Sequence, residues 1–234
     1  HEGYMAACKN VYDMLTLGIS LEQSIDGDKK SYTVKFIDWQ NPENNVYHVT
    51  EEYSVMRAGS HDHYRPDLVL FVNGIPLCII ECKRPDMKEP LKQAISQHLR
   101  SQQEDGIRSL YVYSQVLLSV ATNQALYGTN GTEEKYWSVW EEKFSARAEE
   151  ERFDKTLSKI KNSFLPREVK SILFSERFKY ARNSFDDMEH NESLPVLQDK
   201  YLYCLCRPDR LLDIVFNFIV FETGIKKIAR YPQY

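Results

Sequence analysis

Three residues near the middle of the chain have the side chains needed for metal-dependent hydrolysis. Asp67 is followed, after thirteen mostly apolar residues, by Glu81, and Lys83 comes two residues later. Two carboxylates at strand ends offer the hard oxygen ligands that Mg²⁺ takes, with water and a substrate phosphate completing its shell. The ion lowers the pKa of bound water, and a lysine ammonium can orient that water or neutralise developing charge. The residues therefore suggest phosphodiester hydrolysis, and the plainer alternative is a salt bridge at a sheet end.

A β-hairpin is expected to bring these side chains together. Residues 66–72 and 75–83 are two nearly continuous apolar runs, and Asn73-Gly74 between them is a strong short-range hairpin motif. Runs of this kind are typical of a sheet that is covered on both faces. Glu81 and Lys83 are two residues apart and should point to the same face.

The register of the hairpin decides whether Asp67 joins them. A strict two-residue turn pairs Asp67 with Ile80 and sends Glu81 to the opposite face. A three-residue turn, or one bulge near Pro76, pairs Asp67 with Glu81 instead. Because proline cannot donate to the hydrogen-bond ladder, an irregularity there is plausible, and we predict the offset register.

The remaining patterns predict an α/β fold with a mixed central sheet flanked by helices, followed by a helical C-terminal portion. We expect residues 1–136 to form the α/β core and residues 137–234 a helical extension of the same domain. The expected helices are 4–17, 91–103, 166–185, 196–206 and 209–222, with a further one in 137–165, and the expected strands lie in 31–55, 66–83 and 116–121.

Composition limits the classes of partner. The chain has 234 residues and a formal net charge of −4, so DNA binding needs a local basic patch, a metal ion or a partner subunit. Its five cysteines lack CxxC spacing and are expected to be reduced, as in a cytoplasmic protein. No apolar run reaches the ~18–20 residues of a membrane span, so no membrane association is expected.

The sequence around the acids resembles a known family. Arg-Pro-Asp occurs at 65–67, 84–86 and 207–209, but only the first copy precedes an apolar strand and a hairpin leading to Glu-x-Lys. The stretch 65–83, with its Val-Asn-Gly-Ile-Pro-Leu hairpin, resembles the nuclease core of the restriction (R) subunit of type I restriction–modification enzymes, which are PD-(D/E)xK nucleases. The resemblance implies a restriction-endonuclease-like core that cleaves double-stranded DNA with Mg²⁺.

The resemblance extends to about 65–234 and assigns roles. It implies that Asp67 and Glu81 are metal ligands together with the Cys82 carbonyl, that Lys83 is the catalytic lysine, and that Gln97 supports the site. Residues 91–102 resemble the family's Q-x-x-x-Y helix, but Ser101 stands where the family has tyrosine.

The end of the chain resembles the family as well. Residues 207–221 resemble the close of the nuclease region, and 229–234 the entry to a helicase-like motor. No G-x-x-x-x-G-K-[ST] loop is present, so we expect a fragment of a longer subunit. There the resemblance implies ATP binding, ATP-driven translocation before cleavage, and methylation and specificity subunits as partners.

Other side chains have weaker claims to a role. His61 and His63 could touch a phosphate or a metal, although a polar loop is the plainer interpretation. His98 is expected on a helix surface. The expected DNA-contacting residues are Arg84, Lys88, Lys92, Arg100, His61 and His63. Two rival hypotheses remain: a repair or recombination nuclease with the same core, and a non-cleaving module that binds DNA or another subunit.

Overall fold

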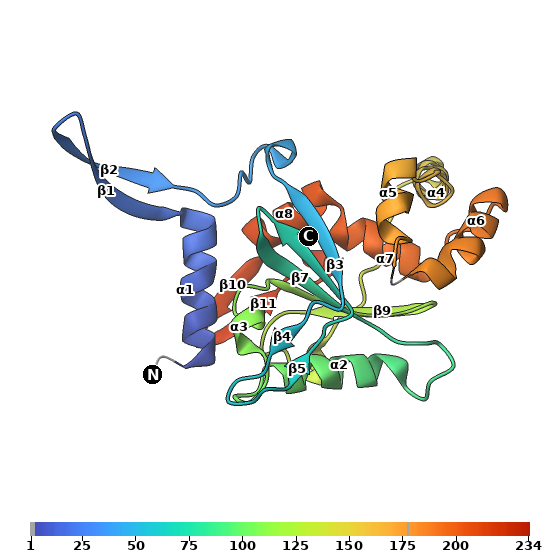
Figure 1. Ribbon diagram of the computed structural model, residues 1–234, viewed down its shortest axis with the longest axis horizontal. Helices are drawn as coiled ribbons and strands as arrows, with labels where there is room; N and C mark the ends of the chain where they lie inside the picture. The colour runs from blue at the N-terminus through green and yellow to red at the C-terminus, as the bar shows by residue number, and fades with distance from the viewer. Residues whose placement is uncertain (1–2, 177) are drawn as a thin grey trace.

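A five-stranded mixed sheet forms the centre of the molecule (Figure 1). The computed structural model describes residues 3–176 and 178–234. The strand order is β3-β6-β7-β8-β9; β7 and β8 are parallel, and the other neighbours are antiparallel. The bounds are β3 (Tyr47–Glu51), β6 (Leu68–Val72), β7 (Ile75–Cys82), β8 (Val116–Ala121) and β9 (Gln124–Gly128). The predicted α/β class with a mixed central sheet is confirmed.

Both faces of this sheet are covered, as its apolar strands predicted. One face packs against α2 (Pro90–Ser101) and the short α3 (Arg108–Tyr111). The other packs against α1 (Tyr4–Leu17), α7 (Leu197–Cys206) and α8 (Pro208–Asn217). All six residues of β8 are buried. Because each face has its own apolar cluster, a side chain on β6 or β7 is assigned to one layer or the other by its position in the strand.

The N-terminal region contains more strands than the sequence predicted. Helix α1 ends before Gly18 as expected, and an exposed hairpin of β1 (Ile19–Ile25) and β2 (Asp28–Val34) projects from the body (Figure 1). A short helix η1 (Pro42–Asn44) precedes β3, and β4 (Val55–Met56) pairs with β5 (His63–Tyr64) ahead of β6. The β4–β5 loop therefore lies directly before the first acid of the proposed site.

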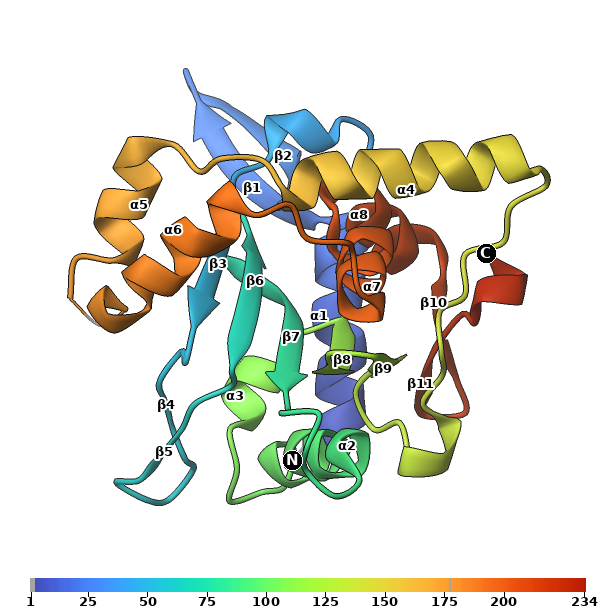
Figure 2. The same cartoon turned by 90° about the vertical axis from the view of Figure 1, so that its right-hand side faces the viewer.

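The C-terminal portion is less helical than predicted. Residues 137–146 form no helix beyond the end of η2 (Glu134–Tyr136), because Ser138 bridges to Tyr127 of β9. Helix α4 (Arg147–Lys161) lies beside α7 (Figure 2). The expected helix 166–185 is instead divided into α5 (Arg167–Leu173), η3 (Lys179–Ala181) and α6 (Arg182–His190). Residue 177 lies outside the described part of the chain.

A hairpin replaces the end of the last predicted helix. Helix α8 stops at Asn217, and β10 (Ile219–Glu222) pairs with β11 (Ile225–Ile228). Thr223 and Gly224 both have positive φ, 49° and 77°, as a two-residue primed turn requires. The short η4 (Tyr231–Gln233) follows. No helix among the described residues is long and apolar enough to cross a bilayer.

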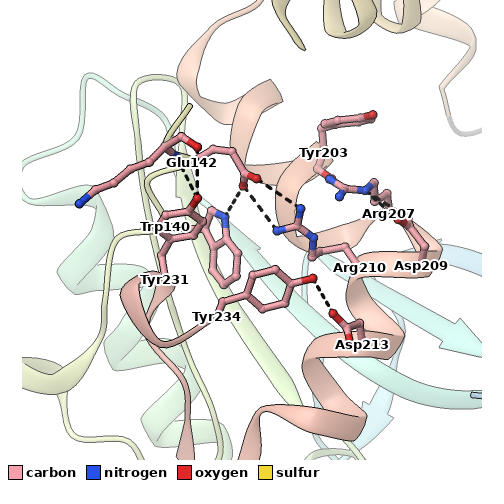
Figure 3. Close-up of polar contacts among 10 residues, drawn as sticks. Trp140, Glu142, Tyr203, Arg207, Asp209, Arg210, Asp213, Tyr231 and Tyr234 are labelled. Atoms are coloured by element: carbon pink, nitrogen blue, oxygen red, sulfur yellow. Dashed lines mark hydrogen bonds and ion pairs between the residues drawn. The ribbon is translucent and has the colours of Figure 1, made fainter. Parts of the chain in front are cut away.

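An aromatic and ionic cluster ties the end of the chain to the body (Figure 3). The Arg210 guanidinium lies 3.3 Å from the Glu142 carboxylate and 4.5 Å from the centre of the Tyr234 ring. Tyr234 and Tyr231 each pack edge-on against Trp140. Residues from 137–146, α8 and the C-terminal segment thus form one packed unit.

Lys226 of β11 is buried, which is unusual for a lysine. Its ammonium donates to the Ser114 carbonyl, to Gln115 Oε1 at 2.6 Å and to Asn130 Oδ1 at 3.0 Å. All three acceptors are neutral. Burial lowers the pKa of Lys226 to about 7, since no carboxylate compensates for the lost water.

Candidate functional site

The predicted offset register is present. Leu68 pairs with Ile80, which puts the preceding Asp67 opposite Glu81. The turn itself is the tight two-residue type, with Asn73 at φ 51° and Gly74 at φ 81°. The extra residue is therefore in β7, where the register shifts just after Pro76.

Packing of β7 shows what the bulge does. Leu77 and Cys78 are consecutive, yet both pack in the cluster on the α1 and α8 side. Ile79 then packs on the α2 side, and Ile80 returns to the first cluster. The alternation thus changes phase by one residue, and Glu81 faces the α2 side.

Asp67, Glu81 and Lys83 meet at the end of the hairpin. The Lys83 ammonium lies 3.6 Å from Asp67 Oδ2 and 3.7 Å from Glu81 Oε2. Asp67 Oδ2 also accepts the Cys82 backbone N–H at 2.7 Å, which fixes the carboxylate against β7. The predicted grouping of two carboxylates and one ammonium is present, and the roles of the three remain to be tested.

The Glu81 carboxylate accepts no hydrogen bond from the described part of the chain. Its side chain is 1% exposed, and neither carboxylate oxygen is hydrogen-bonded to any described residue. Burial, and then the neighbouring Asp67 charge, raise the pKa of Glu81 to about 9, although Lys83 opposes them. A buried carboxylate that accepts no hydrogen bond, with its one cation no closer than 3.7 Å, is costly unless further positive charge binds it. This is the chemistry expected of a cation ligand.

Helix α2 supplies the fourth predicted member. Gln97 Oε1 accepts from the Lys83 ammonium at 2.8 Å, so the amide holds the lysine over the two acids. Lys83 also donates to the Cys82 carbonyl at 3.2 Å. Ser119 lies opposite Glu81 on β8, and its buried hydroxyl has no hydrogen-bond partner within residues 3–176 and 178–234. Sequence reasoning missed it because an isolated serine in an apolar strand carries no recognisable motif.

These donors fit a hard divalent cation that keeps part of its water. No group of three or more His, Cys, Asp or Glu side chains in residues 3–176 and 178–234 is arranged to hold a metal ion. To hold such an ion, Asp67 and Glu81 would need a backbone carbonyl such as that of Cys82, together with water and a substrate oxygen. Mg²⁺ is bound in this way, through one or two carboxylates and several waters.

An open cavity of about 450 Å³ is lined in part by Glu81 and Gln97. Its lining also includes three of the predicted DNA-contacting residues, namely His61, His63 and Arg100. Arg65 also lines the cavity and was not predicted, although it directly precedes the Pro66-Asp67 motif.

Two arginines stack on the ring of Tyr64, a residue of β5 that lines this cavity. The Arg57 and Arg100 guanidiniums lie 4.7 and 5.7 Å from the centre of the Tyr64 ring. Arg57 is neutralised by Asp105 at 2.6 Å. Arg65 and Arg100 form no ion pair with any residue in the described ranges, so their charges face the cavity without a carboxylate partner.

The other predicted DNA-contacting residues do not line this cavity. Arg84 pairs with Asp86 at 3.3 Å, and Lys92 pairs with Glu89. Lys88 is exposed on the loop between β7 and α2. The basic group that the sequence suggested is therefore divided between the cavity and an exposed loop whose charges are partly paired.

His98 is fully buried, so its expected position on the helix surface is wrong. It lies on the inner face of α2, where Tyr111 and the carbonyl of Leu118 are its partners. Burial lowers its pKa to about 4. Ser101, at the position where the resemblance expects tyrosine, is buried as well, and its hydroxyl opposes the high pKa that burial and Glu81 impose on Tyr111.

Comparisons with known proteins show the family of the chain. A protein of Methanocaldococcus jannaschii that is named a putative type I restriction enzyme endonuclease subunit is 35% identical to this chain over 227 residues. The matched region covers 97% of this chain and 19% of that protein. The type I restriction enzyme HindI endonuclease subunit of Haemophilus influenzae is 27% identical over 229 residues, 95% of this chain and 18% of its own length. The chain thus spans about a fifth of these relatives. Residues 2–138 match the family described as type I restriction enzyme R protein N terminus, and the chain belongs to that family.

Proposed function

We propose that Asp67, Glu81, Lys83 and Gln97 form a Mg²⁺-dependent site that hydrolyses phosphodiester bonds of double-stranded DNA. The observation that carries this proposal is the buried Glu81 carboxylate, which lies near a second acid and a lysine but accepts no hydrogen bond from any residue that the structure describes. A salt bridge that served only stability would leave fewer polar atoms unsatisfied.

Each residue has a distinct task in this proposal. Asp67 and Glu81 hold the cation together with the Cys82 carbonyl. Gln97 fixes the Lys83 ammonium, which orients the attacking water or neutralises the developing charge on the phosphoryl oxygens. When bound, Mg²⁺ supplies a more acidic water and positive charge for the phosphoryl group.

The DNA backbone is proposed to approach through the adjoining cavity. Arg65 and Arg100 face it without carboxylate partners, and His61 and His63 offer further donors to phosphate oxygens. Arg84, Lys88 and Lys92 would contact the backbone farther along, and Arg84 and Lys92 would exchange their present acidic partners for phosphates. The net charge of −4 predicts weak affinity for DNA by this chain alone.

The metal site is tested by titrating the chain with Mg²⁺ in a calorimeter. Asp67→Ala should weaken binding strongly, because it removes one of two carboxylate ligands. Asp86→Ala is the matched control, since Asp86 also follows Arg-Pro but is exposed and remote from Glu81. Equal binding by wild type and Asp67→Ala would favour the non-cleaving interaction module.

Cleavage is tested in the full-length subunit, assembled with its partner subunits. In a plasmid-nicking assay Lys83→Ala should lower the cleavage rate at least about a hundredfold, the scale expected for losing one preorganised charge stabiliser. Unchanged nicking by this variant would contradict the assignment of Lys83.

The wider role rests on the family and on the resemblance. We propose that in the longer protein cleavage follows ATP-driven translocation by a motor, within a cytoplasmic restriction complex that contains methylation and specificity subunits. We also propose that residues 1–136 and 137–234 form one domain, which is supported by a common core that runs from Val11 to Ile219. A repair or recombination nuclease would lack such a complex.

A further inference from the structure

Unmatched buried polar atoms are concentrated at one place in the sheet. Within residues 3–176 and 178–234, four buried side-chain oxygens make no hydrogen bond. Two belong to Glu81 and one to Ser119. The fourth, on Asp154 of α4, is ion-paired with Lys200 at 3.0 Å. The acceptor of the proposed cation site and a serine hydroxyl thus share the same deficit.

Glu81 and Ser119 are nearest neighbours across the ladder between β7 and β8. They are partners in its parallel register, and the ladder continues beyond them, because the Lys83 N–H donates to the Val120 carbonyl at 2.9 Å. Neighbouring strands lie about 4.8 Å apart, and partner residues point to the same face. No other side chain of the sheet can therefore stand between the carboxylate and the hydroxyl on that face.

The preceding pair of residues identifies the face. Ile79 and Leu117 are register partners, and both pack in the α2-side cluster. Glu81 and Ser119 follow them by two positions on their strands, so both point to the α2 side. Ser119 is fully buried. Its hydroxyl is therefore enclosed beside the Glu81 side chain, in the layer that α2 covers.

The two groups are chemically complementary. A serine hydroxyl turns about one bond and can donate, whereas an ionised carboxylate can only accept. An ion that binds one carboxylate oxygen leaves the other oxygen buried, and metal-binding carboxylates are commonly hydrogen-bonded by a neighbouring residue. The Lys83 ammonium already donates to Gln97 and to the Cys82 carbonyl. The Ser119 hydroxyl is an uncommitted donor on the strand next to Glu81.

We propose that Ser119 is a positioning residue of the cation site, whose hydroxyl donates to one oxygen of Glu81 while the other oxygen binds a divalent cation. This inference rests on the proposed function, because it concerns the same site. It accounts for the single polar side chain of β8, which is otherwise apolar and fully buried.

Threonine and valine at position 119 form a matched pair of substitutions. They have nearly the same shape, and only threonine keeps the hydroxyl. Both add one carbon to the buried layer, so any crowding is common to the two. Ser119→Ala removes the hydroxyl without adding an atom. Ser114→Ala is the control for losing a buried hydroxyl elsewhere, because Ser114 is fully buried before the start of β8 and donates to the Pro76 carbonyl.

The test is Mg²⁺ titration by calorimetry of the 234-residue chain, with urea unfolding in EDTA measured in parallel. Ser119→Val and Ser119→Ala should weaken binding at least about tenfold, the scale expected when the hydrogen-bond partner of a metal ligand is lost. Ser119→Thr and Ser114→Ala should stay within about threefold of wild type.

Unfolding in EDTA supplies a readout of opposite sign. Ser119→Val should have a urea midpoint at least as high as that of Ser119→Thr, because valine buries no unmatched hydroxyl. Weaker Mg²⁺ binding without lower stability is a combination that a packing defect does not produce.

The outcomes separate the inference from the site on which it rests. Equal affinity of Ser119→Thr and Ser119→Val overturns the inference, and so does wild-type affinity in Ser119→Ala, which decides alone if the larger side chains prevent folding. Losses of affinity that follow the urea midpoints overturn it as well, since packing would then account for them. Failure of the wild type to bind Mg²⁺ overturns the cation site itself, whereas the other results leave that site standing.

Discussion

Replacing Glu81 with glutamine tests the electrostatics of the site without any metal. Glutamine has nearly the same shape and no charge. In the wild type the pKa of Glu81 is raised from an ordinary 4.5 to about 9, so at pH 7 the folded chain keeps a proton that the unfolded chain has released. Holding that proton against an ordinary pKa costs about 3 kcal/mol at pH 7.

The sign of the pH dependence follows directly. Between about pH 4.5 and 9 the unfolded state binds fewer protons than the folded state, so wild-type stability falls as pH rises, by about 1.4 kcal/mol per pH unit. Glu81→Gln lacks this contribution. The stability of the variant relative to wild type should therefore increase with pH, whatever constant cost its buried amide adds.

Urea unfolding in the presence of EDTA, repeated at several pH values from 5 to 8, measures this difference. Glu104→Gln is the control, because the Glu104 side chain is 92% exposed and its removal should add no slope. A difference between Glu81→Gln and wild type that stays constant with pH would refute the argument that Glu81 is buried without compensation.

Three further predictions concern the turn, the buried lysine and the cavity. Gly74→Ala should cost about 1 kcal/mol in urea unfolding, since φ is 81° there while nothing lies near the added carbon; an unchanged midpoint would contradict the turn geometry. Wild-type stability should also contain a rise of about 1.4 kcal/mol per unit between pH 7 and 10, because the pKa of Lys226 is lowered to about 7, and Lys226→Met should remove this rise. Arg65→Ala and Arg100→Ala should each reduce by about one the slope of log affinity for duplex DNA against log salt, measured by fluorescence anisotropy, whereas Lys29→Ala on the exposed hairpin should not.

The site was more predictable than its surroundings because its geometry depends on local rules. The Asn73-Gly74 turn, the proline at 76 and the strict alternation of strand side chains were enough to predict the shared layer of Asp67 and Glu81. Gln97 was found only through the family resemblance, since a glutamine on a helix carries no signature of its own.

The errors arose where tertiary packing overrides local pattern. The polar His98 lies on the buried face of α2 with Ala94 and Ile95, and only its partners on α3 and β8 make that position tolerable. Trp137 and Trp140 have helical spacing, but they belong to an irregular segment paired with β9. The burial of Lys226 could not be predicted locally, because three acceptors distant in sequence hold its ammonium.

The bulge after Pro76 makes the site depend on the pairing register of the β6–β7 hairpin. Across a two-residue turn, positions 67 and 81 would fall on opposite sides of a regular ladder, and a single added residue reverses that outcome. Losing the bulge while keeping all thirteen intervening residues would pair Asp67 with Ile80 and turn Glu81 into the other layer, with every proposed site residue still in the chain. Spacing between the acids therefore identifies a site of this kind only when it is read together with turn length and strand irregularities.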